Sequence, residues 1–242
     1  MPDDVFEHPR LVAIYDALDP DRSDLDVYAA IIAELGARSV LDVGCGTGTF
    51  ALMLADRGID VTGLDPAAGS LDVARAKPQA ESVRWILGDA TCLPLLEVDA
   101  ATMTGNAAQA VVDPADWMAT LRAVRAALRP GGTFVFETRD PAHQAWLGWV
   151  PVASTTTTEV EGVGAVTSWY DLVDVSLPLV TFRGFWRFPD GDVVSSDSTL
   201  RFRERDEVEA QLSDAGFAAV HVRDAPDRPG RELVFLARRH ES

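Results

Sequence analysis

The stretch 40–50, VLDVGCGTGTF, constrains the fold of this chain more than any other part of its sequence. Its apolar first residues are typical of a strand that is covered on both faces of a sheet. Gly44, Gly46 and Gly48 allow tight or left-handed turns and the close approach of another molecule. The apolar residues of 49–57 then predict a packed helix. A strand, a glycine-rich turn and a helix N-terminus together offer free N–H groups to a ligand with oxygen acceptors or negative charge.

Strand and helix patterns alternate through the following hundred residues and predict an α/β fold. Strands are expected at 38–43, 60–65, 82–87, 98–103 and 133–139, and helices at 49–57, 69–77 and 115–128. Such alternation is typical of a parallel sheet with helices on both faces. Ligands of such sheets bind at the carboxyl ends of the strands, near the switch in strand order.

The two ends of the chain add helices and a final hairpin. Apolar faces predict N-terminal helices at about 11–18 and 25–35. Near the other end, a helix at 206–215 precedes strands at 217–222 and 233–237, with no helix between the strands. This order predicts an antiparallel final hairpin.

Residues 151–203 depart from the alternation and are rich in strand formers, with a hairpin turn at 189–192. We interpret them as an antiparallel insertion that covers the site where a substrate would bind at the edge of the sheet. Four of its basic residues suit an anionic substrate, although solvated strand faces need no ligand; these are Arg183, Arg187, Arg201 and Arg203.

The glycine pattern alone leaves two cofactors open. Gly46-x-Gly48-x-x-Ala51, with Asp65 further on, fits the dinucleotide fingerprint of an NAD(P)-dependent oxidoreductase. Taken as Asp42-x-Gly44-x-Gly46-x-Gly48, the same stretch resembles the first motif of the class I S-adenosylmethionine (SAM) methyltransferases. Four further stretches resemble that family in the same order: VTGLDP at 61–66, LGDA at 87–90, DAATMTGN at 99–106 and LRPGGTFVF at 128–136.

The resemblance implies a Rossmann-like, seven-stranded, mostly parallel sheet with helices on both faces and an antiparallel last hairpin, plus the β-rich insertion. The chain then divides into a helical cap at 1–36, a SAM-binding core at 37–150, an acceptor lid at 151–203, and a closing helix and strands at 204–242.

The resemblance also implies a set of cofactor-binding residues. Asp65 would accept the ribose hydroxyls, Asp89 and the next N–H would bind adenine, and carbonyls near Met103 would face the methionine part. The full set is Asp42, Gly44, Cys45, Gly46, Gly48, Asp65, Pro66, Asp89, Ala90, Met103 and Thr104.

Three residues are candidates for catalysis, and each has a plainer alternative. By resemblance Tyr15 borders the methyl-transfer site, although it could simply pack. Asn106 could position a substrate or serve as a turn residue. His143 has a side chain suited to a general base, or lies on the surface at a helix start. Trp146 and Trp149 are one helical turn apart and could wall an acceptor pocket or cover the sheet.

Composition limits the partners. The net charge of −17, from 21 basic and 38 acidic residues, makes a nucleic-acid substrate unlikely, because phosphate backbones are usually bound by a basic face. No apolar run approaches the length of a membrane span. Two cysteines give no disulfide framework, so a reducing cytoplasm is expected.

The sequence therefore predicts an enzyme that transfers a methyl group from SAM to a small molecule and leaves S-adenosylhomocysteine, with no metal. The Asp or Asn followed by two prolines and an aromatic, typical of DNA-amino methyltransferases, is absent after the fourth strand, which favours a small-molecule acceptor. A SAM-binding regulator without activity is the other alternative. The acceptor, the methylated atom and the oligomeric state are not predicted.

Overall fold

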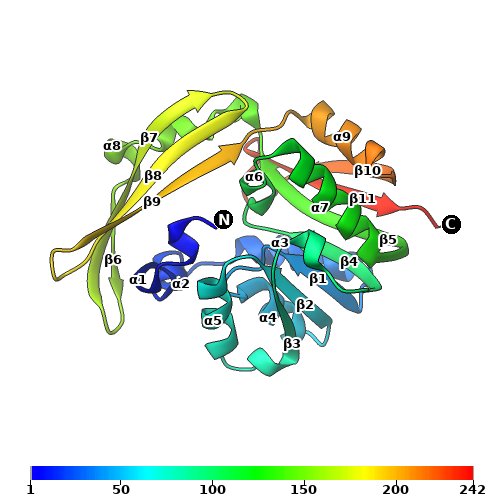
Figure 1. Cartoon of the computed structure of the whole chain (residues 1–242), viewed down its shortest axis with the longest axis horizontal. Coiled ribbons are helices and arrows are strands. Elements are labelled where there is room, and N and C mark those ends of the chain that lie inside the picture. The colour runs from blue at the N-terminus through cyan, green and yellow to red at the C-terminus, as the bar shows by residue number, and fades with distance from the viewer. Residues whose placement is uncertain (1, 242) are drawn as a thin grey trace.

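The computed structural model describes residues 2–241, in two β-sheets that the N-terminal helices connect (Figure 1). Met1 and Ser242, the outer ends of two predicted segments, lie outside the described residues. The larger sheet has seven strands in the order β10-β11-β5-β4-β1-β2-β3. Their bounds are β1 Ser39–Val43, β2 Asp60–Asp65, β3 Val83–Leu87, β4 Val98–Met103, β5 Leu128–Arg139, β10 Phe217–Asp224 and β11 Glu232–Arg239.

The strand directions confirm the predicted fold class. β1 lies parallel to both β2 and β4, and β4 lies parallel to β5. Only β11 runs the other way, antiparallel to β5 and to β10, as the pattern of the last hairpin predicts. The strand order switches direction between β1 and β4, so the carboxyl ends of these two strands mark the expected ligand edge.

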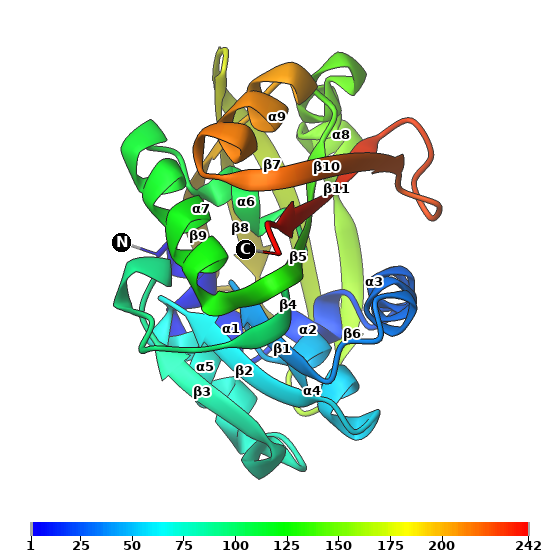
Figure 2. The same cartoon turned by 90° about the vertical axis from the view of Figure 1, so that its right-hand side faces the viewer.

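Helices cover both faces of this sheet (Figure 2). On one face, α3 and α4 share a hydrophobic core with β1, β2 and β11. On the other face, α7 and α9 bury Trp117 and Leu212 against β4 and β5. The helices are α1 Pro9–Val12, α2 Tyr15–Leu18, α3 Asp24–Glu34, α4 Thr49–Asp56, α5 Ala68–Ala76, α6 Ala107–Ala110, α7 Pro114–Ala127, α8 Pro151–Ser154 and α9 Arg205–Asp214.

Two element boundaries differ from the sequence prediction. β5 begins at Leu128 instead of 133, because Leu128 already pairs with Val98 before the register shifts. The single helix expected at 11–18 is two short helices, α1 and α2, with a turn in which the N–H of Ile14 donates to the carbonyl of Leu11. The turn lets Leu11 and Ile14 pack against the smaller sheet, while α2 lies beside the glycine-rich loop.

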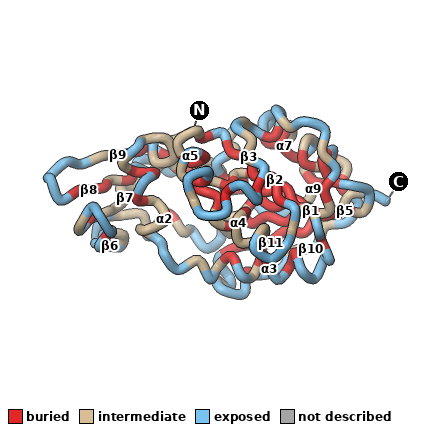
Figure 3. The backbone as a smooth tube through the Cα atoms, turned by 90° about the horizontal axis from the view of Figure 1, so that it is seen from below, coloured by how far each residue is buried: buried red, intermediate tan, exposed pale blue. Residues whose placement is uncertain are grey.

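The β-rich segment forms a separate antiparallel sheet of four strands, as expected, in the order β6-β7-β8-β9. Their bounds are β6 Thr156–Val160, β7 Gly164–Ser176, β8 Leu179–Arg187 and β9 Val193–Arg201. Val166 and Trp186 on its inner face pack against Leu11 and Ile14 of the N-terminal segment. Burial is concentrated in the larger sheet, and the smaller sheet keeps many half-buried and exposed residues (Figure 3).

No helix within residues 2–241 is long and apolar enough to cross a membrane.

Candidate active site

The glycine-rich loop is hydrogen-bonded to the end of β2, and the space beside Gly46 is free of other protein atoms of the described residues. The N–H groups of Gly44 and Cys45 both donate to the carbonyl of Leu64, at 2.8 and 3.1 Å. Gly44, Gly46 and Gly48 have φ angles of 71°, 54° and 79°, which side-chain-bearing residues rarely adopt. A Cβ atom added at Gly46 would meet no heavy atom of residues 2–241 within 4 Å. A ligand can therefore approach the backbone closely at this point.

Asp65, at the carboxyl end of β2, is buried beside that loop. Its Oδ2 accepts the N–H of Gly46 at 2.7 Å, and its Oδ1 accepts the N–H of Ala67 at 2.8 Å. Burial raises the pKa of the carboxyl, and these two hydrogen bonds oppose the shift. Because a carboxylate oxygen accepts more than one hydrogen bond, Asp65 can still accept hydroxyl groups. Pro66 follows it and is exposed.

Asp42 carries a second buried carboxyl at the end of β1. Its Oδ1 accepts the hydroxyl of Thr102 at 2.8 Å, and its Oδ2 has no hydrogen-bond partner in the described part of the chain. Burial raises the pKa of Asp42 to about 7; the hydrogen bond from Thr102 lowers it, and the charge of Asp65 adds a smaller rise. A buried acceptor without a donor is costly, so this oxygen is suited to a donor supplied by a ligand or by water.

Asp89 and Ala90 follow β3, next to Asp65. The N–H of Gly88 donates to the backbone carbonyl of Asp65 at 2.9 Å, which joins the ends of β2 and β3. The exposed side chain of Asp89 accepts the N–H of Thr91 at 2.8 Å and caps a short 3-10 helix, Ala90–Cys92. Hydrogen bonds from Thr91 lower the pKa of Asp89, so this carboxylate is ionised at neutral pH.

Beyond β4, Met103 is buried, Thr104 is half-buried and Asn106 is fixed by two buried carboxylates. Asn106 has a φ of 59°, its N–H donates to Glu137 Oε1 at 2.7 Å, and its Nδ2 donates to Glu232 Oε1 at 2.9 Å. Its own Oδ1 has no donor among residues 2–241. Asn106 is thus held rigidly, with an acceptor oxygen unused.

Glu137 lies near the carboxyl end of the buried strand β5 and is 2% exposed. Burial raises its pKa from 4.5 to about 7; the hydrogen bond from Asn106 opposes the rise, and the charge of Glu232 adds to it. The pKa of Glu137 is higher in the folded protein than in the unfolded chain. Between these two pKa values the folded protein therefore binds more protons than the unfolded chain. Glu137 therefore contributes a loss of stability as the pH rises from about 4.5 to 7.

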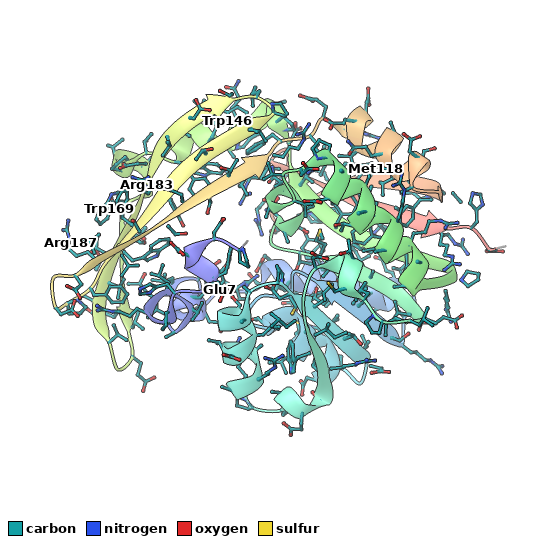
Figure 4. The ribbon with its side chains drawn as sticks, viewed as in Figure 1. Glu7, Met118, Trp146, Trp169, Arg183 and Arg187 are labelled. Atoms are coloured by element: carbon teal, nitrogen blue, oxygen red, sulfur yellow. The ribbon has the colours of Figure 1, made fainter. Side chains whose placement is uncertain are left out.

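The N-terminal segment covers the loops that follow β1 and β2. Glu7 accepts the N–H groups of Ala68 and Gly69, the first residues of α5, at 2.9 and 3.0 Å (Figure 4). Asp16 of α2 accepts the hydroxyl of Thr47 in the glycine-rich loop at 2.6 Å. It also pairs with Lys77 at 2.6 Å. Glu7 and Asp16 thus attach this segment to α5 and to the glycine-rich loop, which flank the expected ligand edge.

Tyr15 precedes Asp16 and is half-buried, with its ring 5.8 Å from that of Phe6. Burial raises the pKa of its hydroxyl above the ordinary value of 10. The hydroxyl is therefore protonated at neutral pH, and Tyr15 is suited to donate a hydrogen bond and not to take up a proton.

The three candidate residues that follow β5 differ in burial. His143 is exposed in a 3-10 helix, Pro141–His143, and its ring makes no side-chain hydrogen bond within residues 2–241. Trp146 is buried, with its ring 4.7 Å from that of Phe202, so it covers the junction of the two sheets. Trp149 is half-buried and faces Phe182 of β8.

Two arginines of the β-rich segment support α6. Arg203 is buried, donates to the carbonyl of Ala108 at 3.1 Å and lies over the ring of Trp117. Arg201 donates to the carbonyl of Val112 at 3.4 Å. Both satisfy backbone acceptors near the end of a helix.

The other two lie on the side of the smaller sheet that faces away from the core (Figure 4). Arg183 pairs with Asp197, at 2.8 Å between Nη2 and Oδ2. Arg187 is exposed and stacks over Trp169. The arginines of this segment therefore do not converge on one anion site, and the sequence-based interpretation of them is not supported.

The sequence interpretation missed Glu137 and Glu232, which bind Asn106, and Arg139, which lies opposite Glu232 in the strand register. The signal was a glutamate inside the apolar run 134–138, since a charge in a buried strand needs a specific partner.

Comparisons with known proteins agree with this geometry. A family model described as a methyltransferase domain matches residues 40–132. The chain is similar to the malonyl-[acyl-carrier protein] O-methyltransferase of Serratia marcescens, with 35% identity over 239 residues that cover 93% of this chain and 84% of that protein.

Two solved structures share the fold. One is the SAM-bound amino pentose methyltransferase of Micromonospora echinaspora involved in calicheamicin biosynthesis, with a TM-score of 0.73, 24% identity, and coverage of 93% of this chain and 94% of that one. The other is the sugar N-methyltransferase of Streptoalloteichus sp., with a TM-score of 0.76, 22% identity, and coverage of 94% and 93%.

Proposed function

The chain belongs to the class I SAM-dependent methyltransferases, and on this premise we propose that it transfers the methyl group of SAM to a small-molecule acceptor. The observation that carries the proposal is the open approach to Gly46 beside the carboxylate of Asp65. This combination offers a close backbone contact and a hydroxyl acceptor at one edge of the sheet. A nucleoside with an attached amino acid needs both.

The residues at the edge fit SAM in chemical type. Asp65 is suited to the ribose hydroxyls, and Asp89 with the N–H of Ala90 is suited to adenine. Asp42, with one oxygen lacking a donor, is suited to the charged amino group of the methionine part. The loop at Gly44, Cys45, Gly46 and Gly48 and the backbone near Met103 and Thr104 would border the same ligand.

SAM, when bound, supplies a methyl group that is already activated on a positively charged sulfur. The task of the protein is then to align the acceptor and to exclude water. Asn106, held by Glu137 and Glu232, provides a fixed oxygen for positioning. Tyr15 provides a hydroxyl that donates. His143 stays a candidate for a general base, although its exposure gives it no special environment.

The names of the relatives support an organic acceptor but differ in its type. The Serratia protein is named for a malonyl group on an acyl carrier protein. The two solved relatives are named for an amino pentose and for a sugar nitrogen. We therefore propose the small-molecule class and leave the methylated atom open.

Calorimetric titration with S-adenosylhomocysteine and, separately, NAD tests the cofactor. We expect saturable binding of S-adenosylhomocysteine alone, weakened at least about tenfold in Asp65→Asn, because one carboxylate oxygen becomes a donor. Asp60→Asn, at the opposite end of the same strand and exposed, is the matched control and should bind as the wild type does. Binding of NAD alone would refute the proposal.

A further inference from the structure

Arg139, the last residue of β5, holds a positive charge at the acceptor side of the sheet without a carboxylate partner. Its Nη1 donates to the amide oxygen of Gln109 at 3.0 Å. No carboxylate oxygen of residues 2–241 lies within 4.0 Å of its guanidinium, whereas nearby Arg228 pairs with Glu232 at 3.0 Å. The Nε and Nη2 groups of Arg139 have no hydrogen-bond acceptor in the same part of the chain. Two donors of a planar fork are therefore unused.

An aromatic side chain borders this guanidinium on one side. Its Cζ lies 5.6 Å from the ring centroid of Trp149. Burial lowers the pKa of Arg139, and the charges of Glu232 and Glu137 oppose the shift. The ring of Trp149 lies 4.6 Å from that of Phe182 on β8. Phe182 in turn contacts Tyr170, on β7, edge to face at 5.5 Å, so Trp149, Phe182 and Tyr170 form one aromatic group. The charge thus lies beside Trp149, which follows β5, and this tryptophan packs on aromatic residues of the smaller sheet.

The two carboxylates closest in the fold are held through Oε1 by other groups, and their Oε2 atoms have no hydrogen-bond partner in the described residues. Glu232 lies opposite Arg139 in the strand register, but its Oε1 accepts from Asn106 and from Arg228. Glu137 lies two residues before Arg139 on the same strand and accepts the N–H of Asn106. Neither forms a salt bridge with Arg139 in the described residues, so the charge of Arg139 lacks a direct counter-ion. A poorly solvated charge without one is costly.

We propose that Arg139, together with Tyr170 and Trp149, binds a carboxylate or phosphate group of the acceptor, so that the substrate of this enzyme is an acidic small molecule. The guanidinium fork matches both groups with two parallel hydrogen bonds. Tyr170 adds a hydroxyl donor, and Trp149 shields the pair from water. This inference rests on the proposed methyltransferase function, and it assigns the acceptor class.

The test uses three probes and the full chain saturated with S-adenosylhomocysteine. Succinate, phenyl phosphate and the neutral control succinamide are titrated calorimetrically at constant ionic strength. We expect binding of at least one of the two anions and not of succinamide. Which anion binds tells a carboxylate acceptor from a phosphate acceptor.

Two variants assign the binding to Arg139. Arg139→Gln should weaken the anion at least about tenfold, because a hydrogen bond to a charged group is lost. Arg187→Gln is the matched control, since Arg187 also lies over a tryptophan, 5.2 Å from the ring of Trp169, but on the exposed outer face. It should bind the anion as the wild type does.

Two results would overturn the inference: neither anion binds the wild type, or the anion binds Arg139→Gln with unchanged affinity. If Arg139→Gln does not fold, Arg139→Lys keeps the charge but not the fork, and the anion should again bind at least several-fold more weakly. S-adenosylhomocysteine titrated alone reports separately on the cofactor site. Cofactor binding without anion binding would refute the acceptor class and leave the methyltransferase function standing.

Discussion

Replacing Gly46 by alanine should abolish cofactor binding while leaving the protein folded. The added Cβ meets no heavy atom of residues 2–241 within 4 Å, so the methyl group would lie in the space where the ligand approaches. Gly58, after α4 and away from the site, has the same two properties: a positive φ, of 80°, and no atom near an added Cβ. Gly58→Ala is therefore a control with the same backbone strain.

The expected energies separate strain from binding. A left-handed alanine costs about 1–2 kcal/mol, and its smaller unfolded-state entropy offsets about 0.4–1 kcal/mol. Both variants should thus lose about 1 kcal/mol, or about 2–4 °C in melting temperature for a chain of this length. S-adenosylhomocysteine at about 100 times its Kd adds about 2.7 kcal/mol, or about 5–11 °C. If the substitution raises the Kd a hundredfold, the same ligand concentration stabilises the protein by only about 0.4 kcal/mol, or about 1 °C in melting temperature.

Thermal melting of the wild type and both variants, with and without S-adenosylhomocysteine, measures these quantities. We expect the ligand-induced rise in the wild type and in Gly58→Ala, and a rise of about 1 °C or less in Gly46→Ala. A full rise in Gly46→Ala would refute the reasoning, because the ligand would then not occupy the space above Gly46. Loss of the rise in Gly58→Ala would also refute it, since strain alone would explain the effect.

Two further predictions concern stability. Between pH 5 and 8 the wild type should lose about 2–3 kcal/mol of unfolding free energy through Glu137, because burial raises the pKa of this residue to about 7. In denaturant titrations over this range, the unfolding free energy of Glu137→Gln should depend less steeply on pH. Exposed Glu159→Gln should keep the wild-type slope, and an equal slope in all three would contradict the assignment. Arg203→Met should cost about 2–4 kcal/mol, because one buried and one partly buried backbone carbonyl lose their donor. In the same melting assay Arg183→Met, which breaks an exposed ion pair, should change little, and equal losses would contradict this role for Arg203.

Several strands of the core could be predicted closely because each is a short run that ends at or just before a glycine or an aspartate, as at Gly44, Asp65 and Gly88. Predicted strands at 60–65 and 98–103 match Asp60–Asp65 and Val98–Met103. The early part of β5, 128–132, could not be predicted, because its proline and glycines are typical of a turn. Only pairing with a neighbouring strand places those residues in the sheet.

The position of a candidate residue could be predicted where a motif ends a strand, and contacts between residues distant in the sequence could not. Asp65 is the last residue of its strand, so its place at the edge of the sheet can be predicted from the local sequence. Glu7 contacts the start of α5 from 61 residues away, and Asn106 contacts Glu232 from 126 residues away. Such contacts depend on the packing of whole elements, which a one-dimensional pattern does not contain.

The packing of the N-terminal segment on the smaller sheet limits how this enzyme can be recombined with its relatives. The smaller sheet is one continuous insertion between β5 and α9, so a cassette exchange at its two ends would seem sufficient to change the acceptor. Yet Leu11 and Ile14 form a shared core with Val166 and Trp186, and Arg10 pairs with Asp190. A functional chimera would have to exchange residues 2–18 together with the insertion. Natural variants that acquire new acceptors should accordingly change in two segments more than a hundred residues apart.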